Sequence, residues 1–384
     1  MKIFAITSAY AWIDDTWLPD ACLTIRDGLI TDISTSKPSG IPLLDASNDL
    51  LLPGFVNAHC HLELTALGPL SEHAYLPWIA ALMAKKKTLS SQAMALGIKT
   101  GAQALLQSGV TTVIDHVSQD TNPKTFTNLP INHIGFGEVL GVNSEMAQAS
   151  LNYWEQQNQL TLSPHSIHAL APDVLRQIFL KRQHPFSIHL AESESERAYF
   201  SDQAGPLWNF IQSRGGKSHD SVSAVAWLQS QGYSSPASLL VHGNYFSDDD
   251  LALIAQWPKA CLVHCPGSHA FFEHQDFPFE KVKLKNISVA LGTDSLASNT
   301  ALSLGHEIKL FCQKYPGQTL QTIMPLITTN ALRAIGITDR GQLAIGQKAD
   351  LSFWKKIDPE KALEAITRQQ KPASVMINGV TVQE

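Results

Sequence analysis

The sequence is poor in charged residues. They make up 16% of the 384 positions, whereas globular domains average about 25%. Together with 44% hydrophobic residues, this composition excludes a disordered chain, which needs high charge and few apolar residues. The chain is long enough for a barrel with insertions or for a barrel with an attached small domain.

Long apolar runs and paired cysteines are also absent. No run reaches the roughly 20 apolar residues of a membrane span, so we expect no membrane partner. The N-terminus, Met1-Lys2-Ile3-Phe4, lacks the basic, apolar and small-residue regions of a secretory signal. The five cysteines are odd in number and include no Cys-x-x-Cys pair. These features predict a reduced, cytoplasmic protein.

Positive charge is scarce as well. The formal net charge is -6 at pH 7, and the longest lysine run is Lys85-Lys86-Lys87. We interpret this run as a solvated helix face rather than as a nucleic-acid patch. The sequence therefore predicts a small-molecule substrate and no nucleic-acid partner. A homodimer is compatible with these features, but the sequence does not determine the oligomeric state.

Between about residues 50 and 335, short apolar runs alternate with segments of helical period, such as 92–107 and 146–157. Eight strand–helix units whose sheet is buried on both faces predict an α/β fold of the (β/α)8 TIM-barrel type. The fourth strand is the least regular, because Ser163-Pro164-His165 interrupts it. The predicted strands span residues 51–59, 110–116, 133–140, 160–170, 186–192, 238–244, 260–266 and 287–294.

The two ends of the chain have a different pattern. Residues 1–50 and 340–384 alternate apolar and polar positions and carry turn signals such as Arg26-Asp27-Gly28. We predict one small composite β-sandwich from residues 1–50 and 339–384, beside a barrel of residues 51–338. Two unrelated peripheral hairpins are the alternative.

Two histidines end the first predicted barrel strand. Residues 53–61 read Pro-Gly-Phe-Val-Asn-Ala-His-Cys-His. Side chains two positions apart on a strand point to the same side, so His59 and His61 can reach one metal ion. Cys60 between them points the other way, and we assign it to core packing.

Polar residues end most of the other predicted strands. Active sites of barrels lie at the carboxyl ends of the strands. One histidine at a strand end is usually structural or solvated, but several such residues on one rim predict a site. The residues at predicted strand ends are His59, His61, His116, Glu138, His165, His168, His189, Glu192, His242, His264 and Asp294.

The fifth predicted strand supplies two of these residues. Residues three apart on an ideal strand face opposite sides. The strand should therefore end near His189, and the chain must turn to bring Glu192 over the same mouth. Nitrogen and carboxylate ligands with an open position describe a catalytic zinc site, although iron or manganese also fits. The predicted reaction class is metal-assisted hydrolysis.

The set of motifs resembles the deaminase/chlorohydrolase branch of the amidohydrolase superfamily. Pro-Gly-Phe-Val-Asn-Ala-His-Cys-His, His-Leu-Ala-Glu, Val-His-Gly and Gly-Thr-Asp-Ser occur in the expected order. A Gly-x-Leu-x-x-Gly-x-x-Ala-Asp-Leu stretch follows near the C-terminus. The resemblance covers nearly the whole chain. No lysine occurs between Lys124 and Lys181, so the bridging carboxylated lysine of dinuclear relatives is not expected.

The resemblance implies a role for each motif. One divalent metal ion, with zinc preferred over iron or manganese, would be bound by the residues His59, His61, His189 and Asp294. Glu192 would shuttle a proton to a ring nitrogen, and His242 would hydrogen-bond the attacking water. The metal ligand Asp294 would also accept a proton from that water.

Substrate contacts are less constrained by the sequence. The resemblance places a substrate-contacting group at His165. Glu138, Ser268, His269 and Trp78 are further candidates, and a plain structural contact is the alternative for each of them.

The predicted activity is hydrolytic deamination of an aminated heterocycle. A metal-bound hydroxide would attack the ring carbon, and ammonia would leave. A purine base, or a 6-aminopurine nucleoside of the adenosine or aminofutalosine type, is the expected substrate. Hydrolytic dechlorination and cyclic amide hydrolysis are the alternatives. A non-catalytic metal-binding protein would have lost a ligand or the acid, and none is missing here.

Overall fold

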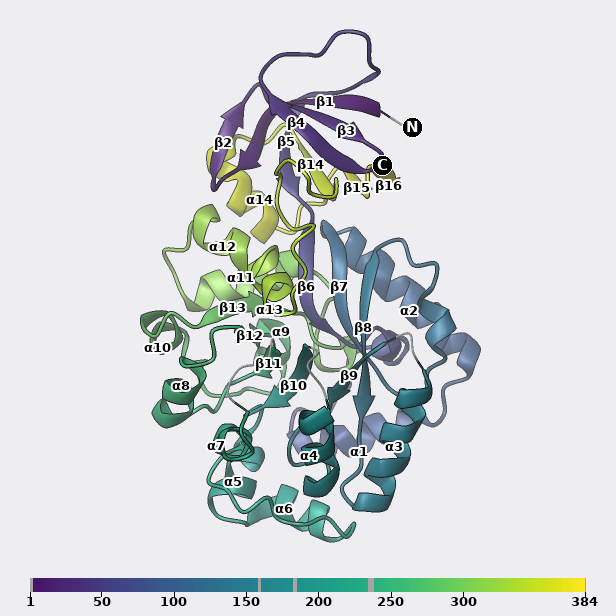
Figure 1. The fold of residues 1–384 in the computed structure, drawn as a ribbon, viewed down its shortest axis with the longest axis vertical. Coiled ribbons are helices and arrows are strands. Elements are labelled where there is room, and N and C mark those ends of the chain that lie inside the picture. Colours follow the sequence, from purple (N-terminus) through teal and green to yellow (C-terminus); the bar gives the residue numbers. More distant parts are fainter. Residues whose placement is uncertain (1–2, 158–159, 182–184, 234–237, 384) are drawn as a thin grey trace.

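The computed structural model describes residues 3–157, 160–181, 185–233 and 238–383. These residues form an α/β fold with three sheets (Figure 1). Two sheets have four parallel strands each, and the third has eight strands and mixed pairing. The predicted α/β class is confirmed. Within the described residues, no helix is long and apolar enough to span a membrane.

The two parallel sheets hold strands close to all eight predicted positions. Parallel strands covered on both faces are apolar throughout, which is why the sequence marks them clearly. The first sheet contains β6 (Phe55–Cys60), β7 (Val110–Val117), β8 (Asn132–Val139) and β9 (Thr161–Pro164). The second contains β10 (Phe186–Leu190), β11 (Ser238–His242), β12 (Ala260–His264) and β13 (Ser288–Leu291).

The predicted strands 186–192, 238–244, 260–266 and 287–294 run two or three residues past the observed ends. Two other predicted strands differ more. The first, 51–59, is divided between two sheets, because β5 (Leu43–Pro53) ends in the third sheet and β6 begins at Phe55. Gly54 lies at the junction, where an added Cβ would come within 2.2 Å of the Thr111 side chain. Only glycine fits there without a shift. The fourth predicted strand, 160–170, stops at Pro164, where the sequence is interrupted.

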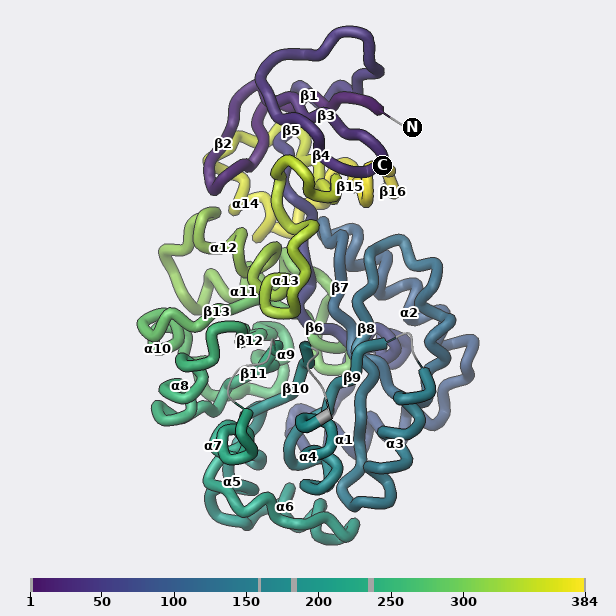
Figure 2. Tube along the Cα trace, in the orientation of Figure 1, coloured from purple at the N-terminus to yellow at the C-terminus, as the bar shows by residue number. Residues whose placement is uncertain are grey.

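Both ends of the chain build the third sheet, which we call the terminal sheet. The N-terminal β5 pairs in parallel with β1 and antiparallel with β14 from the C-terminal segment. This pairing excludes two separate hairpins, and Figure 2 shows the purple and yellow segments side by side. Besides β5, the sheet contains β1 (Ile3–Ile13), β2 (Thr16–Pro19), β3 (Cys22–Arg26), β4 (Leu29–Ser34), β14 (Leu351–Lys355), β15 (Ser374–Ile377) and β16 (Val380–Gln383).

Helices follow most of the parallel strands and cover them from outside (Figure 1). The α-helices are α1 (Tyr75–Lys86), α2 (Ser91–Leu106), α3 (Ser144–Gln156), α4 (Pro172–Lys181), α5 (Glu194–Ser201), α6 (Gly205–Gln212), α7 (Ala224–Ser230), α8 (Asp248–Ile254), α9 (Pro266–Phe271), α10 (Phe279–Leu284), α11 (Leu304–Lys314), α12 (Leu320–Ile327), α13 (Asn330–Ala334) and α14 (Ala362–Thr367). Short 3-10 helices are η1 (Leu62–Leu67), η2 (Pro123–Phe126), η3 (Leu296–Ser298) and η4 (Pro359–Lys361).

Alternate residues of the parallel strands meet in a shared core. One buried cluster joins side chains from both four-stranded sheets, among them Val56, Ile114, Leu239 and Val263. The residues between them pack outward in a second cluster that includes helix residues. Cys60 belongs to this outward cluster and is fully buried. The prediction that it packs in the core, away from the flanking histidines, is confirmed.

Candidate active site at the carboxyl ends of the strands

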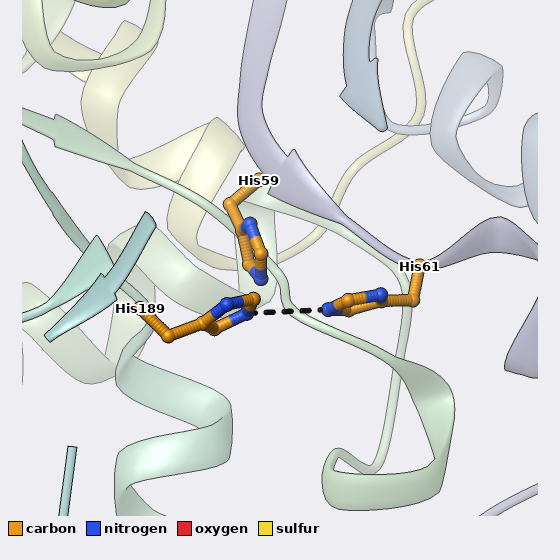
Figure 3. A group of neighbouring side chains, drawn as sticks. All are labelled: His59, His61 and His189. Carbon is orange, nitrogen blue, oxygen red and sulfur yellow. Dashed lines mark hydrogen bonds between the residues drawn. The ribbon is translucent and has the colours of Figure 1, made fainter. Parts of the chain in front are cut away.

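Three histidines meet at the carboxyl ends of β6 and β10. His59 is in β6, His61 follows its last residue, and His189 is in β10. Figure 3 shows the three imidazoles turned toward one another. The Nε2 atoms of His61 and His189 are 3.4 Å apart. Each of the three residues offers a nitrogen within 4.8 Å of the others.

Asp294, just beyond β13, brings a carboxylate to the same place. It forms a parallel bridge with Cys60, which sets it beside the end of β6. Its Oδ1 atom lies 3.6 Å from Nε2 of His59 and 3.8 Å from Nε2 of His61. Asp294 therefore lies beside two of the three histidines, although it is far from them in the sequence.

The chemistry of these side chains fits a divalent metal ion. Neither ring nitrogen of the buried His59 has a hydrogen-bond partner among the described residues. Burial lowers the pKa of His59 to about 4 and that of His189 well below its usual value, so both rings are neutral. Nδ1 of His189 lies 2.8 Å from the carbonyl oxygen of His165. As the donor in that bond, Nδ1 carries the proton and leaves Nε2 free to bind metal.

The Asp294 carboxylate is held by hydroxyl and backbone donors. Ser268 Oγ and Ser298 Oγ donate to its Oδ2 atom at 2.7 and 3.0 Å. The backbone N–H of Ser295 donates to Oδ1 at 2.7 Å. Burial alone raises the pKa of Asp294, but the neighbouring His59 and His242 hold it well below its usual value. The group is therefore ionised, as a metal ligand would have to be.

Glu192 reaches the mouth through a turn, as its spacing from His189 predicts. β10 ends at Leu190, and Ala191 has a φ of 50°. The backbone N–H groups of Ala191 and Glu192 donate to Oε1 and Oε2 of Glu196 at 2.9 and 2.8 Å. These two hydrogen bonds hold the turn that directs the Glu192 side chain over the strand ends.

The carboxyl group of Glu192 lies between two partners. Its Oε1 atom is 3.7 Å from Nε2 of His242, and its Oε2 atom accepts a hydrogen bond from the Tyr75 hydroxyl at 2.8 Å. Burial, and then the negative charge of Asp294, raise the pKa of Glu192 to about 8. A carboxyl group that is largely protonated near neutral pH can donate a proton to a substrate.

His242 lies close to both Glu192 and Asp294. Glu192, His242 and Asp294 each offer a ligand-type atom within 4.8 Å of the others. Burial lowers the pKa of His242 to about 4, so its ring is neutral. Ala191, His242 and Asp294 all have positive φ angles, of 50°, 74° and 56°. Non-glycine residues rarely adopt this conformation, and such strain is concentrated at functional sites.

Glu138 and His165 form a pair beside the histidines. Nδ1 of His165 lies 2.8 Å from Oε1 of Glu138. Despite burial, the neighbouring His165 and His61 hold the pKa of Glu138 well below its usual value. These two residues and His189 also lie within 4.8 Å of one another. Because His189 has only Nε2 free, we assign it to the first cluster and leave the pair as a candidate substrate contact.

The other predicted substrate contacts have structural partners. Ser268 bonds to Asp294, as described above. Nδ1 of His269 lies 3.0 Å from Oδ1 of Asn244, and the indole of Trp78 donates to the carbonyl oxygen of Ala297 at 2.9 Å. All three lie on elements at the strand ends, and their contact with substrate stays a prediction.

One interpretation from the sequence is wrong for a single residue, because Lys85 and Lys87 are exposed as predicted and Lys86 is not. Lys86, in the run assigned to a solvated face, has a side chain that is only 17% exposed. Its ammonium group lies 2.6 Å from Oε1 of the buried Glu63 and 2.6 Å from Oγ of Ser118. Glu63 is only 2% exposed, so the lysine compensates a buried negative charge.

The structure adds site residues that the sequence analysis missed. Tyr75, Glu196 and Ser298 contact proposed catalytic groups directly. A signal existed for one of them, since Ser193 and Glu196 are spaced as in a helix capping box. The Ser193 side chain does cap α5, but the Glu196 carboxylate binds the preceding turn instead. Nothing local in the sequence marks the other two.

Comparison with known proteins agrees with this geometry. The model of the amidohydrolase family matches residues 50–382. The chain is 24% identical over 399 residues to a 5-methylthioadenosine/S-adenosylhomocysteine deaminase of Nitratidesulfovibrio vulgaris, covering 96% of this chain and 86% of that protein. It is 24% identical over 359 residues to an aminodeoxyfutalosine deaminase of Nitratiruptor, covering 86% of each.

Solved structures have the same fold. The aminofutalosine deaminase of Helicobacter pylori in complex with methylthio-coformycin superposes with a TM-score of 0.85 at 22% identity, over 99% of this chain and 100% of that one. An adenosine deaminase of Xanthomonas campestris with bound zinc gives a TM-score of 0.82 at 18% identity, over 98% and 92%.

Proposed function

We propose that this chain, which belongs to the amidohydrolase family, is a metal-dependent deaminase that releases ammonia from an aminated purine base or a 6-aminopurine nucleoside. The enzyme is a hydrolase of carbon–nitrogen bonds in cyclic amidines. The observation that carries this assignment is the meeting of Glu192, whose pKa is raised to about 8, with Asp294 and His242, beside the cluster of His59, His61 and His189. The deaminases among its relatives support the substrate class.

The architecture we propose for this activity is a closed (β/α)8 barrel. Two isolated parallel bridges, Ser166 to His189 and Cys60 to Asp294, support closure because they join the two four-stranded sheets at both edges. The core shared by both sheets supports it too. We further propose that residues 51–338 form this barrel, and that residues 1–50 and 339–384 form a separate domain with two packed layers.

We assign His59, His61, His189 and Asp294 as ligands of one divalent metal ion, with zinc preferred. Three nitrogens and a carboxylate are typical of catalytic zinc sites. When bound, such an ion lowers the pKa of a coordinated water and supplies hydroxide near neutral pH.

Residues of this chain carry out the proton transfers and bind the substrate. Asp294 accepts a proton from the attacking water and passes it to the amino group, which leaves as ammonia, and His242 hydrogen-bonds that water. Glu192 gives a proton to the ring nitrogen next to the attacked carbon, so that no charge accumulates there. Glu138 and His165, which lie beside His189, contact the heterocycle.

Ammonia release from aminated purines, pyrimidines, pterins and nucleosides tests the proposal. The protein is assayed after its metal content has been measured. We expect ammonia from a purine or 6-aminopurine nucleoside. If fully metal-loaded protein released none from any compound, the deaminase assignment would be wrong. Chloride release and cyclic amide hydrolysis would then be assayed.

A further inference from the structure

A hydroxyl group from outside the parallel strands reaches the acid/base carboxylate. Tyr75 is the first residue of α1, which Figure 1 shows on the side of the parallel strands away from the terminal sheet. We infer that Tyr75 is a positioning residue that assigns separate tasks to the two oxygens of Glu192. The inference rests on the proposed function, because it presumes that Glu192 transfers the proton.

Tyr75 is itself held in place by the segment that carries it. We call residues 70–78 the cover segment. Trp78 donates from its indole to the carbonyl oxygen of Ala297 at 2.9 Å, beyond β13. Nδ1 of His73 lies 2.7 Å from the carbonyl oxygen of Phe271, at the end of α9. The cover segment is thus bound to two loops of the mouth.

The backbone of Glu192 is fixed on both sides. Its N–H donates to Glu196 at 2.8 Å, and its carbonyl oxygen accepts from Nδ2 of Asn244 at 3.0 Å. The terminal torsion of a glutamate remains soft, with a broad two-fold profile. The hydrogen bond from Tyr75 restricts this torsion by holding Oε2.

The second oxygen is thereby turned to the reacting centre. Oε1 of Glu192 lies 3.7 Å from Nε2 of His242, which also approaches Asp294. Oε1 is the oxygen that gives its proton to the ring nitrogen, and it recovers a proton from the newly added hydroxyl group as the product forms. Tyr75 keeps its own proton throughout, because burial and the nearby Glu192 raise the pKa of its phenol well above the usual value.

The first test is the Tyr75→Phe variant, which removes the hydroxyl and keeps the ring. We expect kcat to fall by about 10- to 100-fold, the size expected for losing a hydrogen bond to the carboxylate charge that forms as Glu192 gives up its proton. KM should change less than about three-fold, and the metal content should stay the same. A loss confined to KM would assign Tyr75 to substrate binding, and unchanged kinetics would remove any role; either overturns the inference.

Tyr315→Phe is the matched control. The Tyr315 hydroxyl also donates to an oxygen, the carbonyl of Phe277 at 2.7 Å, and its ring also packs among aromatic rings. This variant loses a comparable hydrogen bond away from the metal ligands. We expect its kcat and KM to match those of the wild type.

A double variant separates positioning from general weakening of the fold. If Tyr75 acts through the Glu192 carboxylate, Tyr75→Phe should lower kcat less than about two-fold in a Glu192→Gln background. A full additional loss in that background would contradict the inference.

A crystal structure of the Tyr75→Phe protein provides a readout that needs no turnover. We expect the Glu192 carboxylate to rotate or to occupy two orientations. An unchanged carboxylate would overturn the role of Tyr75 whatever the substrate proves to be. Failure of every ammonia assay, in contrast, would overturn the deaminase assignment alone.

Discussion

At the scale of single residues, Glu192 and Asp294 show how neighbouring carboxyl groups acquire different tasks. Both are buried, with exposed fractions of 7% and 6%. Asp294 faces histidines and hydroxyl donors, which keep it ionised. Glu192 faces the negative charge of Asp294, which with burial favours its protonated form. One carboxyl group is therefore suited to bind metal and the other to donate a proton.

Glu192→Gln tests this division. Glutamine keeps the size of the side chain but has no proton to transfer. We expect kcat to fall by about 10²- to 10⁴-fold, as for loss of a general acid. The metal content, measured by elemental analysis, should not change. The nearby Glu194→Gln is the control, because Glu194 is exposed and pairs with Arg197. A fully active Glu192→Gln enzyme would refute the assignment.

Glu307 is a buried carboxyl group without a direct catalytic role. It is 0% exposed, and it accepts hydrogen bonds from the N–H of Gly267 at 2.6 Å and from Nδ2 of Asn299 at 2.8 Å. Burial raises its pKa from 4.5 to about 8. Between these values the folded state binds more protons than the unfolded state. The free energy of unfolding therefore falls as the pH rises through this window.

Glu307→Gln should reveal this dependence. Replacing Glu307 by glutamine removes one hydrogen-bond acceptor at every pH. It also removes the free-energy cost of ionising a buried carboxyl group at high pH. We expect the variant to unfold at a lower temperature than the wild type at pH 5. The gap, which is the difference between their unfolding temperatures, should be smaller at pH 8.5. Thermal unfolding at the two pH values measures both gaps. Equal gaps would show that Glu307 ionises normally in the folded protein.

At the scale of elements, the turn from β10 to α5 places the acid. Ala191 adopts a positive φ so that the chain leaves the strand and carries Glu192 over the mouth. The Glu196 carboxylate stabilises this turn by accepting both N–H groups, one on each oxygen. Glu196, in the first turn of α5, thus supports the site by binding the backbone of the turn that carries Glu192.

Glu196→Gln should weaken the turn without touching the metal ligands. The amide keeps one acceptor, but its NH2 group faces the other N–H donor. A buried donor left unsatisfied costs about 1–3 kcal/mol, so we expect kcat to fall roughly ten-fold with metal content retained. Steady-state kinetics and elemental analysis measure the two quantities. Wild-type kcat in this variant would mean that the turn holds without Glu196.

At the scale of the whole molecule, the proposed ligands link distant parts of the fold. They come from the ends of β6 and β10 and from the segment after β13. A metal bound only by the folded state stabilises that state by mass action. Among the proposed ligands, the buried His59 has no hydrogen-bond partner for either ring nitrogen within the described residues, so we expect the ion to compensate its burial.

Removal of the metal with a chelator should therefore lower the unfolding temperature as well as abolish activity. Readdition of zinc should restore both. Differential scanning calorimetry before and after chelation measures the first effect. Chelated protein that contains no metal but keeps its activity and unfolding temperature would contradict the ligand assignment.

The sequence by itself determined the strands and the main site candidates of this protein. Apolar runs, the spacing of His59 and His61, and the distance from His189 to Glu192 are local patterns, and burial and strand geometry depend on such patterns. The sequence did not predict that strand 51–59 is divided at Gly54. The close approach of Thr111 from β7, which leaves no room for a side chain at Gly54, is a long-range contact.

Only the tertiary structure decided which residues support the site. Tyr75 and Glu192 are 117 positions apart, and Ser268 and Asp294 are 26 apart. No periodicity connects such residues, because their contacts follow from how the loops at the strand ends fold over the mouth. The pairing of β5 with β14 and the burial of Lys86 against Glu63 have the same origin. Local patterns specify elements, whereas long-range packing specifies which side chains meet.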